Sequence, residues 1–124
     1  MIRLIQRRLI IPRGDTGSFT IPVQGTVEDG DIAVFSIYDP MTHTTVFEKE
    51  VELTEEVLTI PFSHQDTVNL EPKKYLWDIK TYRNPQYDED NLLIGGDEIN
   101  SYYAAFSLPI CEIKEVAQNV WSKS

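Results

Sequence analysis

The strongest constraint on the fold of this chain is an alternation of apolar and charged side chains with a period of two. In the segment 46–53, one face carries Phe47, Val51 and Leu53, and the opposite face carries glutamates at positions 48, 50 and 52. Successive side chains of a β-strand point to opposite faces. The pattern therefore predicts a strand with one face in the protein core and the other in water.

Similar short segments recur along the chain. Residues 19–23 alternate in the same way, and Pro22 places this strand at an edge, because proline donates no hydrogen bond to a neighbouring strand. Residues 32–38 are apolar on both faces, which is typical of a central strand. Further strands are expected over the ranges 3–12, 57–62, 75–80 and 102–113.

The segments between these strands carry turn and capping residues. Ser63 is followed three residues later by Asp66, a spacing that predicts a single helical turn with a capping box. Residues 83–96 are polar and contain one proline and two glycines, which predicts a long hairpin loop.

Short strands at even spacing, with at most two short helical turns, indicate an all-β protein. We expect a single antiparallel immunoglobulin-like β-sandwich of six to eight strands. The length of 124 residues fits one domain. The sandwich is expected over residues 1–113, and residues 114–124 are expected to form a C-terminal tail or a short helix.

The charge of the chain is uneven. Its net charge is −9, from 20 acidic and 11 basic side chains, which argues against nucleic-acid binding. Arg3, Arg7, Arg8 and Arg13 nevertheless cluster near the start, with no acidic residue among them. Arg3, Arg7 and Arg8 are therefore a candidate assembly surface that attracts the acidic body of a neighbouring copy. The alternative is that these arginines pair with an acidic strand of their own sheet.

The sequence shows no segment that is typical of export or membrane insertion. Arginines interrupt the apolar residues near Met1, so no signal peptide is recognised, and no apolar run approaches the ~20 residues of a membrane helix. We expect synthesis in the cytoplasm and no membrane partner.

No catalytic or metal-binding pattern is found. His43 and His64 lie in expected turns without a nucleophile motif beside them, and Cys111 has no partner at zinc-type spacing. The acidic loop 88–91 departs from the calcium-binding EF-hand pattern. We expect no catalytic residue, no cofactor and no metal. The acidic side chains of the loop are interpreted as charges exposed to solvent.

The tripeptide Arg13-Gly14-Asp15 matches the sequence that adhesion proteins present to integrins. Here it lies between two expected strands, where Gly14 and Gly17 supply turn geometry and Asp15 can cap backbone amides. Folding alone accounts for these residues, and adhesion is not the function we expect.

Two stretches carry a resemblance to a known family. One is Arg-Gly-Asp-Thr-Gly-Ser-Phe at 13–19, and the other is Pro-Lys-Lys-Tyr-Leu-Trp-Asp-Ile-Lys at 72–80, with a final strand after Gly-Gly-Asp at 95–97. Together they resemble small immunoglobulin-like β-sandwich structural proteins of bacteriophages and prophages. The nearest group is the N-terminal domain of upper baseplate (receptor-binding) proteins from phages of Gram-positive hosts.

The resemblance implies a virion component that assembles through protein contacts rather than an enzyme. It implies structural roles for Tyr75, Trp77 and Asp78, with the two aromatic side chains in the core and Asp78 on the opposite face. The partners would be other virion proteins, copies of the chain itself, or both, in a homo-oligomer. Baseplate proteins carry a longer chain after this domain, which the 124 residues here leave no room for.

A second interpretation is a carbohydrate-binding module that recognises bacterial surface glycans. Tyr82 and Tyr87 flank the acidic loop and are the candidate residues for stacking on sugar rings. An enzyme is the third interpretation, since unrelated activities occur on the same fold.

Overall fold

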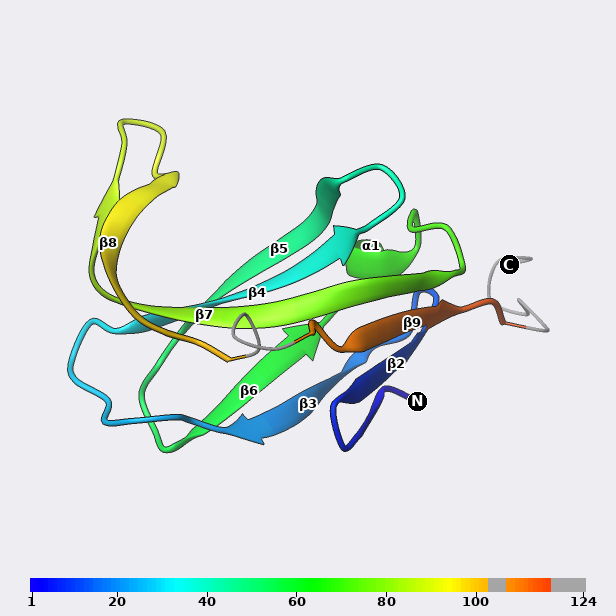
Figure 1. The fold of residues 1–124 in the computed structure, drawn as a ribbon, viewed down its shortest axis with the longest axis horizontal. Coiled ribbons are helices and arrows are strands. Elements are labelled where there is room, and N and C mark those ends of the chain that lie inside the picture. The colour runs from blue at the N-terminus through cyan, green and yellow to red at the C-terminus, as the bar shows by residue number, and fades with distance from the viewer. Residues whose placement is uncertain (103–106, 117–124) are drawn as a thin grey trace.

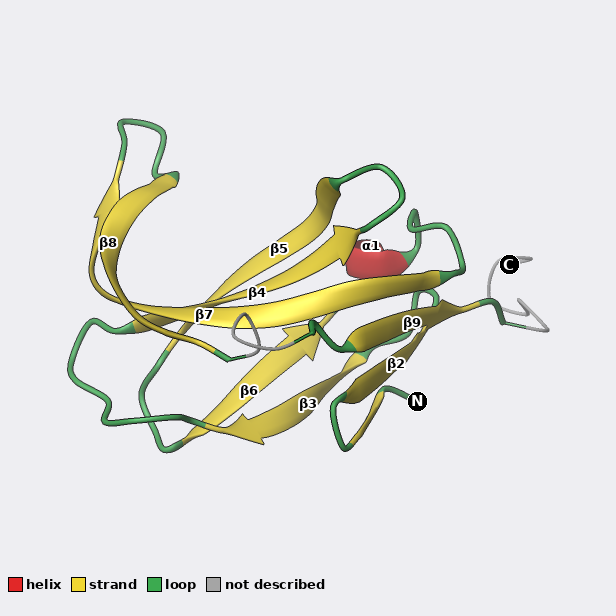
Figure 2. Ribbon diagram, viewed as in Figure 1, coloured by secondary structure: helices red, strands yellow, loops and turns green. Residues whose placement is uncertain are grey.

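Nine strands and one short helix make up the part of the chain that the structure describes, residues 1–102 and 107–116. Figures 1 and 2 show this computed structural model. The elements are β1 (Arg3–Ile5), β2 (Arg8–Pro12), β3 (Gly17–Pro22), β4 (Ile32–Asp39), β5 (Thr44–Glu52), β6 (Val57–Phe62), α1 (His64–Thr67), β7 (Lys74–Tyr87), β8 (Leu93–Ser101) and β9 (Ile110–Lys114). The seven-stranded sheet has the order β1-β2-β9-β7-β4-β5, with β8 also paired to β7, and β3 and β6 form a two-stranded sheet.

The two sheets enclose an aromatic core. Phe19 and Phe62 come from the small sheet, and Phe35 and Trp77 come from the large one. The ring of Phe19 meets that of Trp77 edge to face, with centroids 5.6 Å apart. Phe35 and Phe62 form a second edge-to-face pair at 5.6 Å. These contacts hold the sheets face to face, and the expected all-β sandwich is confirmed.

One strand pair differs from the antiparallel arrangement that we expected. β2 runs parallel to β9, with register partners from Leu9 with Cys111 to Pro12 with Lys114. Parallel neighbours need a long connection between them. Here most of the domain lies between Pro12 and Ile110 and forms that connection.

The strand count also exceeds the expected six to eight, partly because the first segment is divided. The range 3–12 was expected to form one strand, but Gln6 has a φ of 57° and starts a two-residue turn between β1 and β2. This turn brings Arg8 opposite Ile5 and makes β1 an edge strand.

The polar range 83–96 forms the expected hairpin, but most of it is β-strand, and the connecting loop is shorter than the long hairpin loop that we expected. β7 continues to Tyr87, and β8 begins at Leu93. β4 begins at Ile32, which pairs with Tyr82, so beyond that point β7 has β8 as its strand partner. We call residues 83–97 the arm. Figure 1 shows the arm projecting from the end of the sandwich opposite the N-terminus. A ribbon with both faces exposed to solvent needs no alternation of apolar and polar side chains. For this reason the alternation did not predict these strands.

The last strand is shorter than the expected range of 102–113. β8 ends at Ser101, and β9 begins only at Ile110. Residues 103–106, which include Tyr103 and Phe106, lie outside the described residues. Most of the expected tail or helix at 114–124 also lies outside them, since the description ends at Val116.

The expected helical turn is present as α1. The Asp66 carboxylate accepts a hydrogen bond from the Ser63 backbone N–H at 2.8 Å, which is half of a capping box. The same carboxylate accepts a bond from Lys49 Nζ at 2.7 Å. The turn is thereby attached to β5.

Candidate assembly surface

The outer edge of β1 forms one boundary of the seven-stranded sheet. β1 pairs with β2 on one side, and no strand of the described residues pairs with its other side. Arg3 is exposed, and the side chain of Ile5 is 51% exposed. Arg7 is exposed in the turn that follows. An exposed edge strand can pair with a strand of another chain, and apolar and cationic side chains lie beside this one.

The three candidate arginines have different surroundings. Arg8 Nη2 donates a hydrogen bond to Glu112 Oε1 of β9, two strands away from β1. This bond is the main reason that the pKa of Glu112 lies below its usual value. No ion pair involves Arg3 or Arg7 within residues 1–102 and 107–116. The structure therefore pairs Arg8 within its own sheet, whereas Arg3 and Arg7 are exposed.

The residues of the 72–80 motif have structural surroundings. Tyr75 and Trp77 are 3% and 0% exposed. The Tyr75 hydroxyl donates to the backbone oxygen of Glu71 at 2.7 Å. Asp78 lies on the outer face, where its carboxylate accepts a hydrogen bond from the Ser101 hydroxyl at 2.6 Å. The motif thus joins the core to β8.

The Arg13-Gly14-Asp15 tripeptide is held by contacts within the chain. Arg13 Nη2 lies 2.7 Å from Glu115 Oε1, and the Asp15 carboxylate lies 3.1 Å from the amino group of Met1. The backbone of Gly14 bonds to α1 on both sides: its N–H donates to Thr67 Oγ1 and its oxygen accepts from His64 Nδ1, each at 2.8 Å. The tripeptide therefore connects the start of the chain to α1.

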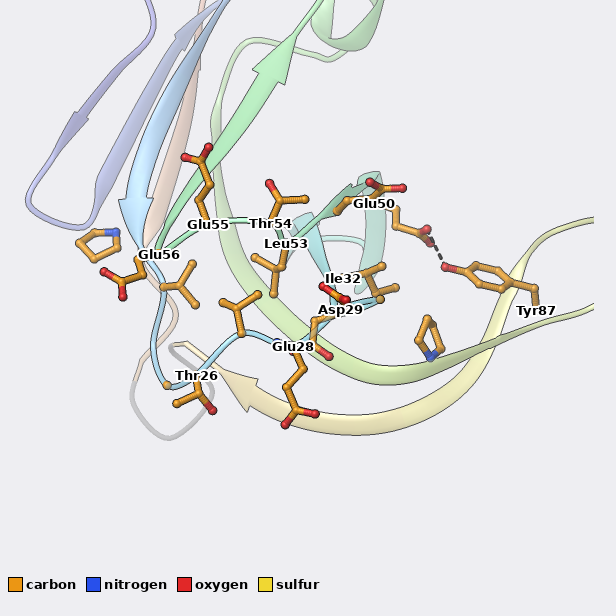
Figure 3. A pocket seen from close by; sticks show the side chains of 18 residues that line it. Thr26, Glu28, Asp29, Ile32, Glu50, Leu53, Thr54, Glu55, Glu56 and Tyr87 are labelled. Atoms are coloured by element: carbon orange, nitrogen blue, oxygen red, sulfur yellow. Dashed lines mark hydrogen bonds between the residues drawn. The ribbon is translucent and has the colours of Figure 1, made fainter.

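A large acidic hollow lies between the arm and the loops that precede β4 and β6 (Figure 3). Its volume is about 1090 Å³. Val23, Val27 and Leu53 contribute apolar surface. Seven carboxylate side chains also line it, so cationic groups are favoured there over anions: Glu28, Asp29, Asp31, Glu50, Glu52, Glu55 and Glu56.

One of these carboxylates, that of Asp31, is buried and paired. Asp31 is 1% exposed and accepts hydrogen bonds from Arg83 Nε at 3.1 Å and Nη2 at 3.0 Å. Arg83 also lies 2.9 Å from Glu28. The hydrogen bond from Arg83 is the main cause that lowers the pKa of Asp31. This cluster fixes the base of the arm to the loop before β4.

The two tyrosines proposed for sugar stacking line different hollows. Tyr87 borders the acidic hollow, and its hydroxyl donates to Glu50 Oε2 at 2.8 Å, as Figure 3 shows. Tyr82 borders a second hollow of about 330 Å³ on the outer face of β4, β5 and β7, together with Tyr38. A single platform that uses Tyr82 and Tyr87 is therefore not formed.

The histidines and the cysteine have structural surroundings. His64 holds Gly14, as described above, and His43 lies in the exposed turn between β4 and β5 with a φ of 56°. Cys111 is buried, and this burial raises the pKa of its thiol to about 12. The described residues contain no cluster of three or more His, Cys, Asp or Glu side chains placed to hold a metal ion.

The sequence pattern did not single out three apolar residues that the structure exposes to solvent: Ile5, Leu92 and Ile94. The structure places Ile5 in β1, Leu92 in the turn between β7 and β8, and Ile94 in β8. They are 51%, 62% and 65% exposed. The signal in the sequence was the apolar run Leu92-Leu93-Ile94, which interrupts an otherwise polar segment.

Comparison with protein-family models, curated protein sequences and solved structures finds no match to this chain. Within the described ranges, no helix has both the length and the apolar character that crossing a bilayer requires. The fold and the surfaces are thus the basis for a functional proposal.

Proposed function

We propose that this chain is a non-enzymatic structural module of a bacteriophage or prophage particle, as part of a baseplate, a tail or a fibre attachment. It acts through protein–protein assembly. Its partners are other virion proteins, copies of itself, or both, and it is made in the bacterial cytoplasm.

The observation that carries this proposal is the open edge of β1. Arg3 and Arg7 are exposed beside it and have no ion pair in the described part of the chain. Edge strands with complementary charge are a common route to specific association. The resemblance of residues 13–19 and 72–80 to phage structural modules supports the setting in a virion.

The experiment is a measurement of solution mass by light scattering after size exclusion, at low and high salt. We expect a defined oligomer that dissociates more readily at high salt, because salt screens the arginine charges. The edge variant Arg3→Glu/Arg7→Glu should remain folded and lose association. Arg8 is left unchanged, since it bonds to Glu112.

The control is Lys74→Glu/Lys114→Glu, which makes the same change in net charge on exposed residues of β7 and β9. It should associate like the unmodified protein. A monomer at both salt concentrations would contradict self-assembly, and equal loss in the control would show that net charge, and not the β1 edge, controls association.

Carbohydrate binding is the second candidate, and the hollow beside Tyr82 is the observation that favours it. Tyr38 and Tyr82 supply aromatic surface there, and Glu48 and Lys80 supply polar groups. Calorimetry with bacterial wall polysaccharides tests it. Tyr82→Ala should abolish binding, while Tyr87→Ala, in the other hollow, should not. Absence of binding to any host polysaccharide would remove this candidate.

A further inference from the structure

The arm is a two-stranded ribbon with open edges. Beyond Tyr82, β7 pairs with β8 alone, and no strand of the described residues pairs with the outer edge of β8. Three register shifts interrupt the β7–β8 pairing. An isolated two-stranded ribbon is only marginally stable in water. The arm is thus an extension that gains stability when another element packs on it.

The arm also exposes apolar side chains. Leu92 and Ile94 are 62% and 65% exposed, and Tyr87 is 40% exposed. Scattered apolar residues on a surface need no explanation, but these three lie within eight positions of one another on one projecting element.

The charge of the arm is opposite to that of the β1 edge. It carries Asp88, Glu89, Asp90 and Asp97, and its single basic residue, Arg83, is bound by Asp31 and Glu28. The β1 edge carries Arg3 and Arg7 around the exposed Ile5. Each surface therefore combines an open strand edge with apolar side chains, and the two differ in the sign of their charge.

We propose that the arm of one copy packs on the β1 edge of the next copy, with the acidic side chains of the arm facing Arg3 and Arg7. This proposal rests on the proposed function and names the partner surface of that edge. The occupant is a second copy of this chain, because one chain carries both complementary surfaces and Figure 1 shows them at opposite ends of the molecule.

The placement of the two surfaces determines the type of assembly. An interface between two different patches is heterologous and joins copies head to tail. Such contacts form a ring when the rotation between copies closes, and an open filament when it does not. A symmetric dimer through two β1 edges would leave the arm without a role and is distinguishable by experiment.

The experiment compares the edge variant with an arm variant, Leu92→Ser/Ile94→Ser, by light scattering and by sedimentation over a range of concentrations. The arm variant should raise the dissociation constant at least about tenfold. The serines would bury less apolar surface in the interface than Leu92 and Ile94 do. The matched control is Val57→Ser on β6, which is 52% exposed and lies off the arm. Urea unfolding verifies that each variant remains folded.

The edge and arm variants are then mixed. Each retains one intact surface, so the mixture should form a complex with one copy of each at concentrations where each variant alone is monomeric. Association of the arm variant at the level of the unmodified protein would overturn this inference and leave the proposed function standing. A mixture that remains monomeric would also overturn it. A monomeric unmodified protein would overturn both this inference and the self-assembly part of the proposed function.

Discussion

The indole N–H of Trp77 donates a hydrogen bond to the backbone oxygen of Arg7 at 3.0 Å. This bond connects the centre of the aromatic core to the turn between β1 and β2. A side chain with no exposed surface thus positions the arginine proposed for assembly. Loss of the bond should affect both the stability of the domain and the order of the β1 edge.

Replacement of Trp77 by phenylalanine should lower the free energy of unfolding by about 1–3 kcal/mol, because the acceptor at Arg7 loses its partner. Urea denaturation measures the loss. Hydrogen exchange should show reduced protection of β1 and β2. Phe35→Leu removes volume from the same core without a hydrogen bond and serves as the control. Equal protection of β1 in the two variants would contradict a role for this bond in positioning the edge.

Replacement of Gly14 by alanine should be more destabilising than replacement of Gly30. Both glycines have positive φ, +79° and +88°, so each alanine incurs about 1–2 kcal/mol of backbone strain. An added Cβ at Gly14 would lie 3.0 Å from two atoms of the His64 ring, whereas at Gly30 it would meet nothing within 4 Å. In urea unfolding, the free energy of unfolding of Gly14→Ala should be lower than that of Gly30→Ala. Equal stability would show that the His64 ring moves without cost.

Replacement of Asp31 by asparagine should produce a loss of stability that depends on pH. The pKa of Asp31 in the folded protein lies below its usual value of 3.8, so its charge stabilises the fold above that value. This contribution declines as the pH falls through the folded pKa. At pH 7 the variant should lose about 1–3 kcal/mol, and the difference should shrink between about pH 5 and pH 2.

Urea midpoints of the unmodified protein and the variant at several pH values test this expectation. Asp29→Asn is the control, because Asp29 is exposed in the same loop and lines the same hollow. The difference in urea midpoint between Asp31→Asn and the unmodified protein could instead stay constant from neutral to acidic pH. Such a result would show that Asp31 stabilises the fold through its shape and not through its charge.

The thiol of Cys111 should be almost unreactive in the folded protein. Burial raises its pKa from 9.0 to about 12, which lowers the thiolate fraction at pH 8 about a thousandfold. Labelling with an aromatic disulfide reagent should therefore be slow in buffer and complete in concentrated guanidinium. Labelling in buffer at the rate of an unfolded control would contradict the burial of this side chain.

Elements that depend on local chemistry could be predicted from the order of the residues. The two-residue alternation in 46–53 indicated β5, and the spacing of Ser63 and Asp66 indicated α1, because side-chain direction and capping involve residues within a few positions of one another. The core position of Trp77 was implied by the resemblance of residues 72–80, and in the structure this side chain is buried.

The pairing of the strands, and the ion pairs formed among the described residues, depend on contacts between distant parts of the chain. Arg8 and Glu112 are 104 positions apart, and they meet because β2 runs parallel to β9. The sequence treats Arg7 and Arg8 alike, but the hairpin directs one into its own sheet and leaves the other in the exposed turn. The strands of the arm could not be predicted for a related reason. A ribbon outside the core has no buried face, so its sequence shows no alternation of apolar and polar residues.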